Sequence, residues 1–237
     1  HVQNTTGNFV VWMHNNANNI SIDNCYLEGS RTTTTFSSAV VAGTDVNTSA
    51  TMAGDNANNV SITNSTIVGN YYGIVITGPS TTTHGSGITI SNNDFEDQYY
   101  YGIRAYSMDS VEIHNNSIPD FRNTFSYGLY MYYNDIINIT GNNIPDASTY
   151  ALYMYYPNRY LTSAPSSQNL VANNMFAGGT AGLYTYSPRF MNFYHNTIQG
   201  NTYGMYLSGS TSIGYEDINV KNNIFAQETP STSTLSA

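Results

Sequence analysis

A pattern of eight residues recurs eight times along the chain and limits the fold more than any other feature. Each copy has two apolar residues alternating with polar ones, a corner rich in asparagine, and a final apolar residue. The copies are ISIDNCYL (20–27), VSITNSTI (60–67), ITISNNDF (88–95), VEIHNNSI (111–118), INITGNNI (137–144), NLVANNMF (169–176), MNFYHNTI (191–198) and INVKNNIF (218–225). A strand this short cannot bury its apolar face alone, so neighbouring copies must cover each other.

A second strand of alternating character precedes each copy. Its copies are FVVWM (9–13), AVVAG (39–43), GIVIT (73–77), GIRAY (102–106), GLYMY (128–132), ALYMY (151–155), GLYTY (182–186) and GMYLS (204–208). Period-two strands joined by short Gly and Asn corners, with no helical periodicity between them, predict parallel strands and exclude a βαβ fold. The small residue that opens most of these strands fits a place where a side chain would collide with the next coil.

Asparagine dominates the corner that follows the second strand of each copy. The first corner position holds Asn24, Asn64, Asn92, Asn115, Asn173 or Asn222, and Gly141 or His195 in the two other copies. Asn and Gly tolerate the left-handed backbone that such a corner needs, and stacked asparagines can hydrogen-bond along the column. The next column adds Asn93, Asn116, Asn142, Asn174, Asn196 and Asn223. We expect both columns to be architectural.

From Phe9 to Phe225 these repeats resemble the right-handed parallel β-helix of the pectate-lyase-like superfamily. The resemblance implies an all-β solenoid of about eight to nine coils with three short sheets, the third expected just after residues such as Ile67 and Ile144. We expect residues 1–237 to form a single β-helix domain. Because no amphipathic capping helix is visible, the sequence favours a window of a longer solenoid, with the Ser/Thr-rich stretch 227–237 leading toward a further strand. The loops 29–38, 46–58 and 157–168 are expected to carry specificity.

Composition narrows the classes of function. Only 9% of the residues are charged, and 15 acidic against 6 basic residues give a net charge of -9. The chain therefore lacks the basic stripe that nucleic-acid binding requires. Its single cysteine, Cys25, precludes an intrachain disulfide and is expected to be a small buried filler. No apolar run is long enough to span a bilayer, so we expect no membrane insertion.

Tyrosines fill the outward positions of the upstream strands. One outward column reads Val75, Arg104, Tyr130, Tyr153, Tyr184, Tyr206, and the next reads Thr77, Tyr106, Tyr132, Tyr155, Tyr186, Ser208. At a rise of about 4.8 Å per coil they would form two ladders and a flat pavement about 20 Å long. Such ladders could simply stiffen the sheet, because aromatic residues favour strands, or they could contact sugar rings or another protein. Single-stranded nucleic acid is disfavoured by the scarcity of Lys and Arg.

An enzymatic alternative rests on a group of charged residues within two successive coils. Its members are Asp94, Glu96, Asp97, Arg104, Asp109, Glu112 and His114. Glu112 and His114 share the outward face of one strand and could act as an acid–base pair, with Arg104 as a further candidate. Their expected neighbours are Thr89, Asn138, Ser91 and Thr140, which supply no second carboxylate and favour a solvated charged patch.

The sequence predicts no metal site and no cofactor. His14, His84 and His195 fall on different coils without metal-ligand spacing. Calcium, which the resemblance to carbohydrate-active β-helix enzymes brings into question, has no support from the acidic residues of this chain.

The sequence thus favours a non-enzymatic, structural or adhesive segment of an extracellular or cell-surface β-helix protein whose partner is a glycan or a surface protein. The candidate binding residues are Tyr106, Tyr130, Tyr132, Tyr153, Tyr155, Tyr184, Tyr186 and Tyr206. Two alternatives stay open. One is a polysaccharide lyase or glycoside hydrolase with its site near Glu112 and His114, and the other is a fibre or coat assembly protein.

Overall fold

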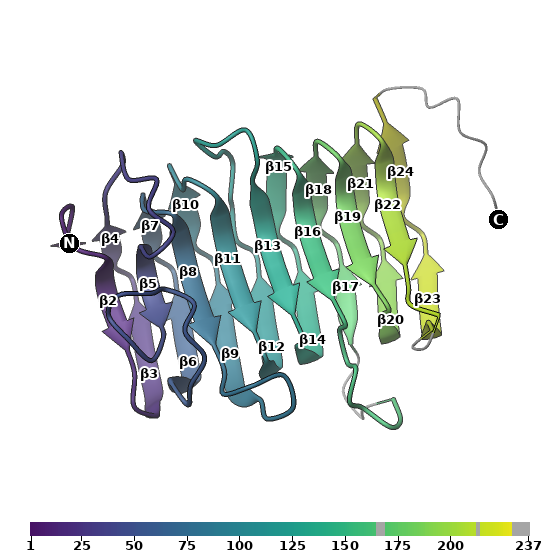
Figure 1. The fold of residues 1–237 in the computed structure, drawn as a ribbon. Coiled ribbons are helices and arrows are strands. Elements are labelled where there is room, and N and C mark those ends of the chain that lie inside the picture. Colours follow the sequence, from purple (N-terminus) through teal and green to yellow (C-terminus); the bar gives the residue numbers. More distant parts are fainter. Residues whose placement is uncertain (165–168, 212–213, 229–237) are drawn as a thin grey trace.

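The computed structural model describes residues 1–164, 169–211 and 214–228, which form an elongated stack of β-coils (Figure 1). Every strand pair is parallel, as the repeats predict. The first sheet has eight strands in the order β2 (Phe9–Met13), β5 (Ala39–Gly43), β8 (Tyr72–Thr77), β11 (Tyr101–Tyr106), β13 (Tyr127–Tyr132), β16 (Tyr150–Tyr155), β19 (Ala181–Tyr186) and β22 (Tyr203–Ser208). These strands match the expected upstream strands, and from β8 onward they begin one residue earlier.

The second sheet is built from the recurring pattern itself. Its eight strands are β3 (Ala17–Asp23), β6 (Ala57–Thr63), β9 (Gly85–Ser91), β12 (Met108–His114), β14 (Asp135–Thr140), β17 (Leu170–Ala172), β20 (Arg189–Tyr194) and β23 (Glu216–Lys221). With one strand in each sheet per coil, the described residues form eight coils, within the expected number.

The third sheet lies one corner later and is divided into two parts. One part holds β1 (Val2–Gln3), β4 (Tyr26–Glu28), β7 (Thr66–Val68) and β10 (Asp94–Glu96), and the other holds β15 (Asn143–Ala147), β18 (Met175–Gly178), β21 (Thr197–Gly200) and β24 (Ile224–Gln227). The prediction that this sheet follows Ile67 and Ile144 is wrong, because both residues lie inside its strands and are buried. The corner uses so few residues that the final apolar residue of each repeat already belongs to the third sheet.

The core consists of stacked apolar columns that run the length of the solenoid. In the first sheet, Leu129 faces Leu152 in the neighbouring coil, and both are fully buried on the same side of the wall. Glycine is required where this sheet begins. A Cβ at Gly128 would lie 2.5 Å from the carbonyl oxygen of Ala151 and 2.6 Å from Ile144, which is the expected collision with the next coil.

The corner asparagines have the predicted left-handed backbone. Asn64, Asn115 and Asn173 have φ values of 51°, 54° and 56°, and His195 and Gly141 in the same column have 56° and 67°. The hydrogen-bonded ladder, however, runs mainly through the next column. There the side-chain nitrogen of Asn116 donates to the side-chain oxygen of Asn142 at 2.9 Å, and the pattern continues from Asn93 to Asn223. These side chains point inward, where no water competes for their hydrogen bonds.

Strand β4 ends at Glu28 and β5 begins at Ala39, so the two strands flank the predicted loop 29–38. The loop predicted at 46–58 ends earlier, because Ala57 and Asn58 open strand β6. In the loop 157–168, residues 165–168 lie outside the described residues, as do residues 229–237 of the Ser/Thr-rich stretch.

Cys25 is half-buried and packs against the core. No helix in the described part of the chain is long and apolar enough to cross a membrane.

Candidate functional site

The two predicted tyrosine columns stand in register on the outside of the first sheet. Strand pairing places Tyr130 beside Tyr153 and Tyr184, and Tyr132 beside Tyr155 and Tyr186. Ring centroids of successive tyrosines in these ladders lie 4.8 to 5.0 Å apart, with interplanar angles of 7° to 13°. At the end of the first column, Tyr206 meets Tyr184 edge-on. The alternation of the repeats therefore placed each predicted tyrosine on the outer face.

A third column of tyrosines, absent from the sequence-based prediction, widens this surface. It contains Tyr72, Tyr101, Tyr127 and Tyr150, then Ala181 and Tyr203. Strict alternation would turn Tyr101 inward. In the structure a corner lies at this point, so Gly102 faces the core side chain of Ile118 while the Tyr101 ring contacts that of Tyr130 at 5.4 Å. The Tyr-Gly pair that opens successive strands was the available signal. We call the three columns the tyrosine array.

The predicted flat pavement is wrong, because the rings cannot lie flat. Two coplanar aromatic rings do not fit side by side at a centroid distance of 4.9 Å, the distance between Tyr130 and Tyr153. Near-parallel rings at this spacing overlap face to face or with an offset. The ring faces within the array are therefore largely covered by neighbouring tyrosines. The array presents ring edges and phenol hydroxyls to its surroundings.

The hydroxyls of the central tyrosines are free to bind other groups. Among the described residues, the hydroxyls of Tyr130, Tyr132, Tyr153 and Tyr155 have no hydrogen-bond partner, and none of the four is a buried unsatisfied atom. By contrast, the hydroxyl of Tyr133, just outside the array, accepts a hydrogen bond from Arg159 at 3.0 Å. A row of free phenol groups therefore repeats with the rise of the coils.

Burial and crowding raise the pKa of several phenols at the centre of the array. Desolvation, helped by repulsion from neighbouring tyrosines, raises the pKa of Tyr127 and the pKa of Tyr155 to about 12. The same causes raise the pKa of Tyr153 further, and desolvation raises the pKa of Tyr130 although the charge of Arg104 opposes the shift. Near neutral pH each phenol is therefore an uncharged group that can donate and accept a hydrogen bond.

The three candidate catalytic residues do not come together. Arg104 belongs to the first sheet, where its guanidinium lies over the rings of Tyr106 and Tyr130 at 5.3 and 5.8 Å. Glu112 and His114 belong to β12 in the second sheet, which is a different face of the coil. Arg104 is thus part of the tyrosine array and not a partner of the other two residues.

Glu112 and His114 form a surface pair, as their spacing predicts. The Nε2 atom of His114 lies 3.2 Å from Glu112, and its Nδ1 atom lies 2.6 Å from the hydroxyl of Thr140. The side chains of His114 and Glu112 are 26% and 50% exposed. The strand neighbours are Thr89 and Asn138 beside Glu112, and Ser91 and Thr140 beside His114, as expected. A carboxylate for the second role in glycoside cleavage is lacking at these neighbouring positions.

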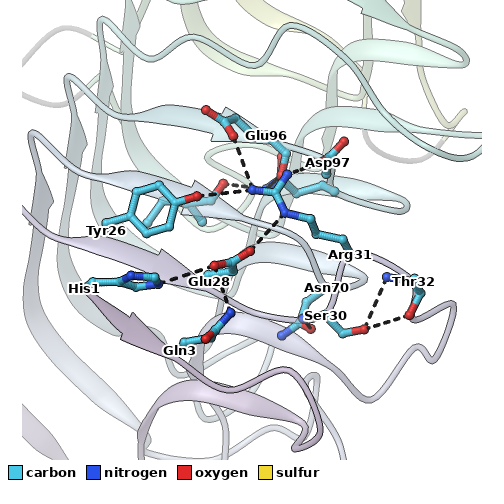
Figure 2. Close-up of polar contacts among 12 residues, drawn as sticks. His1, Gln3, Tyr26, Glu28, Ser30, Arg31, Thr32, Asn70, Glu96 and Asp97 are labelled. Carbon is cyan, nitrogen blue, oxygen red and sulfur yellow. Dashed lines mark hydrogen bonds and ion pairs between the residues drawn. The ribbon is translucent and has the colours of Figure 1, made fainter.

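The acidic residues that sequence grouped with this pair are spread over the coil. Asp94 and Glu96 lie on β10 in the third sheet, where Glu96 joins an ion-pair network centred on Arg31 (Figure 2). Arg31 also contacts Asp97, bonds Glu28 at 3.0 Å, and thereby holds the loop 29–38 against the third sheet. Because Arg31 links carboxylates of the third sheet to the loop, the network is a structural brace.

A buried acid–histidine pair lies at the corner between the first and second sheets, and no local sequence pattern indicates it. His84 Nδ1 lies 3.4 Å from Asp135 Oδ2, although the two residues belong to different coils. Asp109 is the strand neighbour of Asp135. Only the fold brings these residues together, because 51 positions separate His84 from Asp135 in the sequence. Within the described ranges, no group of three or more His, Cys, Asp or Glu residues could hold a metal ion.

Comparison with known proteins identifies the architecture alone. A family model described as the right-handed β-helix region matches residues 50–225. This match agrees with the parallel sheets and confirms the expected right-handed coil. None of the curated proteins and none of the solved structures compared with the chain matches it.

Proposed function

Because the chain belongs to the right-handed β-helix family, whose shared fold does not fix an activity, we propose its function from its surface: the tyrosine array binds a glycan. The chain acts as a non-enzymatic adhesive segment of an extracellular or cell-surface protein. The observation that carries this proposal is the row of phenol hydroxyls without internal partners on Tyr130, Tyr132, Tyr153 and Tyr155.

The chemistry of the array favours a glycan over a protein partner. Protein interfaces gain much of their affinity from large aromatic and apolar faces buried in pockets. Here the tyrosine faces cover one another, so edges and hydroxyls are what a ligand meets. A polyhydroxylated ligand can exchange hydrogen bonds with such hydroxyls and pack its C–H groups against the ring edges. Acidic side chains are lacking on the outward positions of β11, β13, β16 and β19.

The repeat of the array also indicates how the glycan lies. Coils repeat at about 4.8 Å, which is close to the length of one sugar residue in an extended chain. A linear polysaccharide parallel to the solenoid axis would therefore place one sugar over each coil, with equivalent contacts at each step. Affinity then increases with chain length until the ligand covers the coils of the array.

The test removes the hydroxyls and keeps the rings. In a triple variant, Tyr130→Phe, Tyr153→Phe and Tyr155→Phe, the stacked columns remain, and loss of about 0.5–1.5 kcal/mol per hydrogen bond predicts binding at least tenfold weaker. Binding would be measured by affinity electrophoresis in a panel of linear polysaccharides, and by calorimetry with oligosaccharides of increasing length. Tyr194→Phe on the second sheet is the matched control, because its hydroxyl bonds Asn192. Unchanged binding in the triple variant, or no polymer bound by the wild type, would refute the proposal.

A further inference from the structure

His84 and Asp135 tie a loop of one coil to a strand two coils away. His84 ends the loop 78–84, immediately before β9, and Asp135 opens β14. Strand β12 lies between them, because Ser86 pairs with Asp109 and Asp109 pairs with Asp135. The two side chains are 10% and 9% exposed, and Asp135 Oδ1 is buried with no partner among the described residues. This is a contact between two groups that would both be better solvated in water.

The contact between His84 and Asp135 requires one proton more than these two side chains hold when they are apart at alkaline pH. His84 Nε2 lies 3.1 Å from the carbonyl oxygen of Thr81, which can only accept a hydrogen bond, and Nδ1 faces the carboxyl group of Asp135. A neutral imidazole has one N–H group and cannot satisfy two acceptors. Both contacts are made only when the imidazole is protonated or when Asp135 carries the proton. Loss of that shared proton removes one of the two contacts.

The surroundings of the pair determine when the proton is held. Burial raises the pKa of Asp135 to about 6; His84 opposes the shift, Asp109 adds to it, and Arg189 opposes it. The Tyr160 ring stands edge-on to His84 at 6.0 Å, and Arg159 stacks on Tyr160. Arg189 itself pairs with Glu216. A raised carboxyl pKa stabilises the contact below the unfolded value near pH 4, and this contribution is lost as the pH rises through about 6.

The rest of the loop is only weakly attached. Its two ends are fixed, since the backbone N–H groups of Gly78 and Gly85 donate to the carbonyl oxygens of Tyr106 and Ser107. Between them, Ser80 and Thr83 bond each other within the loop. Among the described residues, only His84 in the loop contacts a side chain of another coil through a polar group.

We propose that His84 and Asp135 form a proton-operated clasp, which holds the loop 78–84 closed over the coil corner in mild acid and releases it when the shared proton leaves. The loop begins directly after Thr77, which stands in the same column as Tyr106 and Tyr132. Opening of the loop therefore changes what lies beside the edge of the tyrosine array as the pH rises. The clasp does not depend on what the array binds.

Hydrogen exchange of the backbone amides of 80–84 tests the clasp. Between about pH 4 and pH 6, the range between the unfolded pKa of a carboxyl group and the raised pKa of Asp135, the protection factors should fall by up to about tenfold per pH unit, as release of one proton requires. Amides of β13, the strand that directly precedes β14, should keep constant protection over the same range and serve as the internal reference.

Two variants make the result decisive. Asp135→Asn can donate a hydrogen bond to His84 Nδ1 without a titrating proton, so the loop should stay protected at every pH. His84→Gln should likewise abolish the pH dependence, and it decides the matter if Asp135→Asn does not fold. His114→Gln is the matched control, because it alters an exposed histidine–carboxylate pair and should leave the wild-type pH dependence intact. A loop whose protection is independent of pH in the wild type, or an Asp135→Asn or His84→Gln variant that retains the wild-type slope, would overturn the clasp.

Discussion

The side-chain nitrogen of Asn142 donates a hydrogen bond to the side-chain oxygen of Asn174 in the next coil at 3.0 Å, inside the solenoid. The same nitrogen lies 2.9 Å from the carbonyl oxygen of Ile113 in the coil before. Each ladder asparagine therefore joins three coils and satisfies backbone groups that the corner leaves unpaired. Buried polar groups of this kind stabilise a fold only when every partner is present.

We expect Asn142→Ala to destabilise the protein by about 3 kcal/mol, because it leaves several buried groups without partners. These include the backbone N–H of Asn116 and the carbonyl of Ile113. Urea unfolding followed by circular dichroism would measure the change. Asn115→Gly is the control, because Asn115 is exposed and its φ of 54° suits glycine. Equal stability of the two variants would contradict a structural role for the ladder.

Gly128→Ala should also destabilise the fold, by about 1–3 kcal/mol, as overpacking of a filled site does. The new methyl group would collide with the backbone of Ala151, which cannot move without shifting its whole strand. The free energy of unfolding in urea measures the effect. Gly214→Ala provides the comparison, because no atom lies within 4 Å of its added Cβ. A neutral Gly128→Ala would mean that the coils are spaced more loosely than described.

The tyrosine array should make the protein sensitive to strong alkali. Tyrosine in an unfolded chain ionises near pH 10, whereas burial raises the pKa of Tyr127 and of Tyr155 to about 12 in the fold. The array's contribution to stability is therefore fully present below about pH 10 and is lost as the pH rises through about 12. Tyrosinate absorbance and circular dichroism, recorded together, should show ionisation of the array accompanied by loss of β-structure. Ionisation of all tyrosines near pH 10 in an intact fold would be the contrary result.

The loop 29–38 should depend on Arg122, which lies far from it in sequence. The guanidinium of Arg122 donates to the carbonyl oxygens of Asp97, Thr33 and Asn70 at 2.8, 3.2 and 3.3 Å. Because three carbonyls lose a donor, we expect Arg122→Gln to speed proteolytic cleavage within this loop, with a stability loss of about 1–3 kcal/mol. Arg104→Gln, which leaves the loop untouched, is the control. Equal cleavage rates in the two variants would show that Arg122 does not hold the loop.

Much of the wall could be predicted from the repeats. Alternation of apolar and polar residues assigned Leu129 to the core and Tyr130 to the surface, because successive side chains of a strand point to opposite faces. The left-handed corners at Asn64 and Asn115 followed from the backbone preferences of asparagine. These are local properties, and a periodic chain repeats them in every coil.

Three features required the coordinates. The outward turn of Tyr101 depends on a corner that interrupts the alternation, and the upright stacking of Tyr130 on Tyr153 depends on the distance between coils. The spread of Glu96, Arg104 and Glu112 over three faces depends on where each corner bends the chain.

The sequence alone determined that this chain winds into a parallel solenoid and which residues form its inner and outer columns, because each strand carries that information in its own alternation. Only the tertiary structure decided which side chains of different coils meet, as His84 and Asp135 do. The loops that join the strands vary in length, so positions in the sequence do not reveal which loop residue reaches which coil. Contacts between coils depend on the path of these loops in space, and this path determines which side chains can interact.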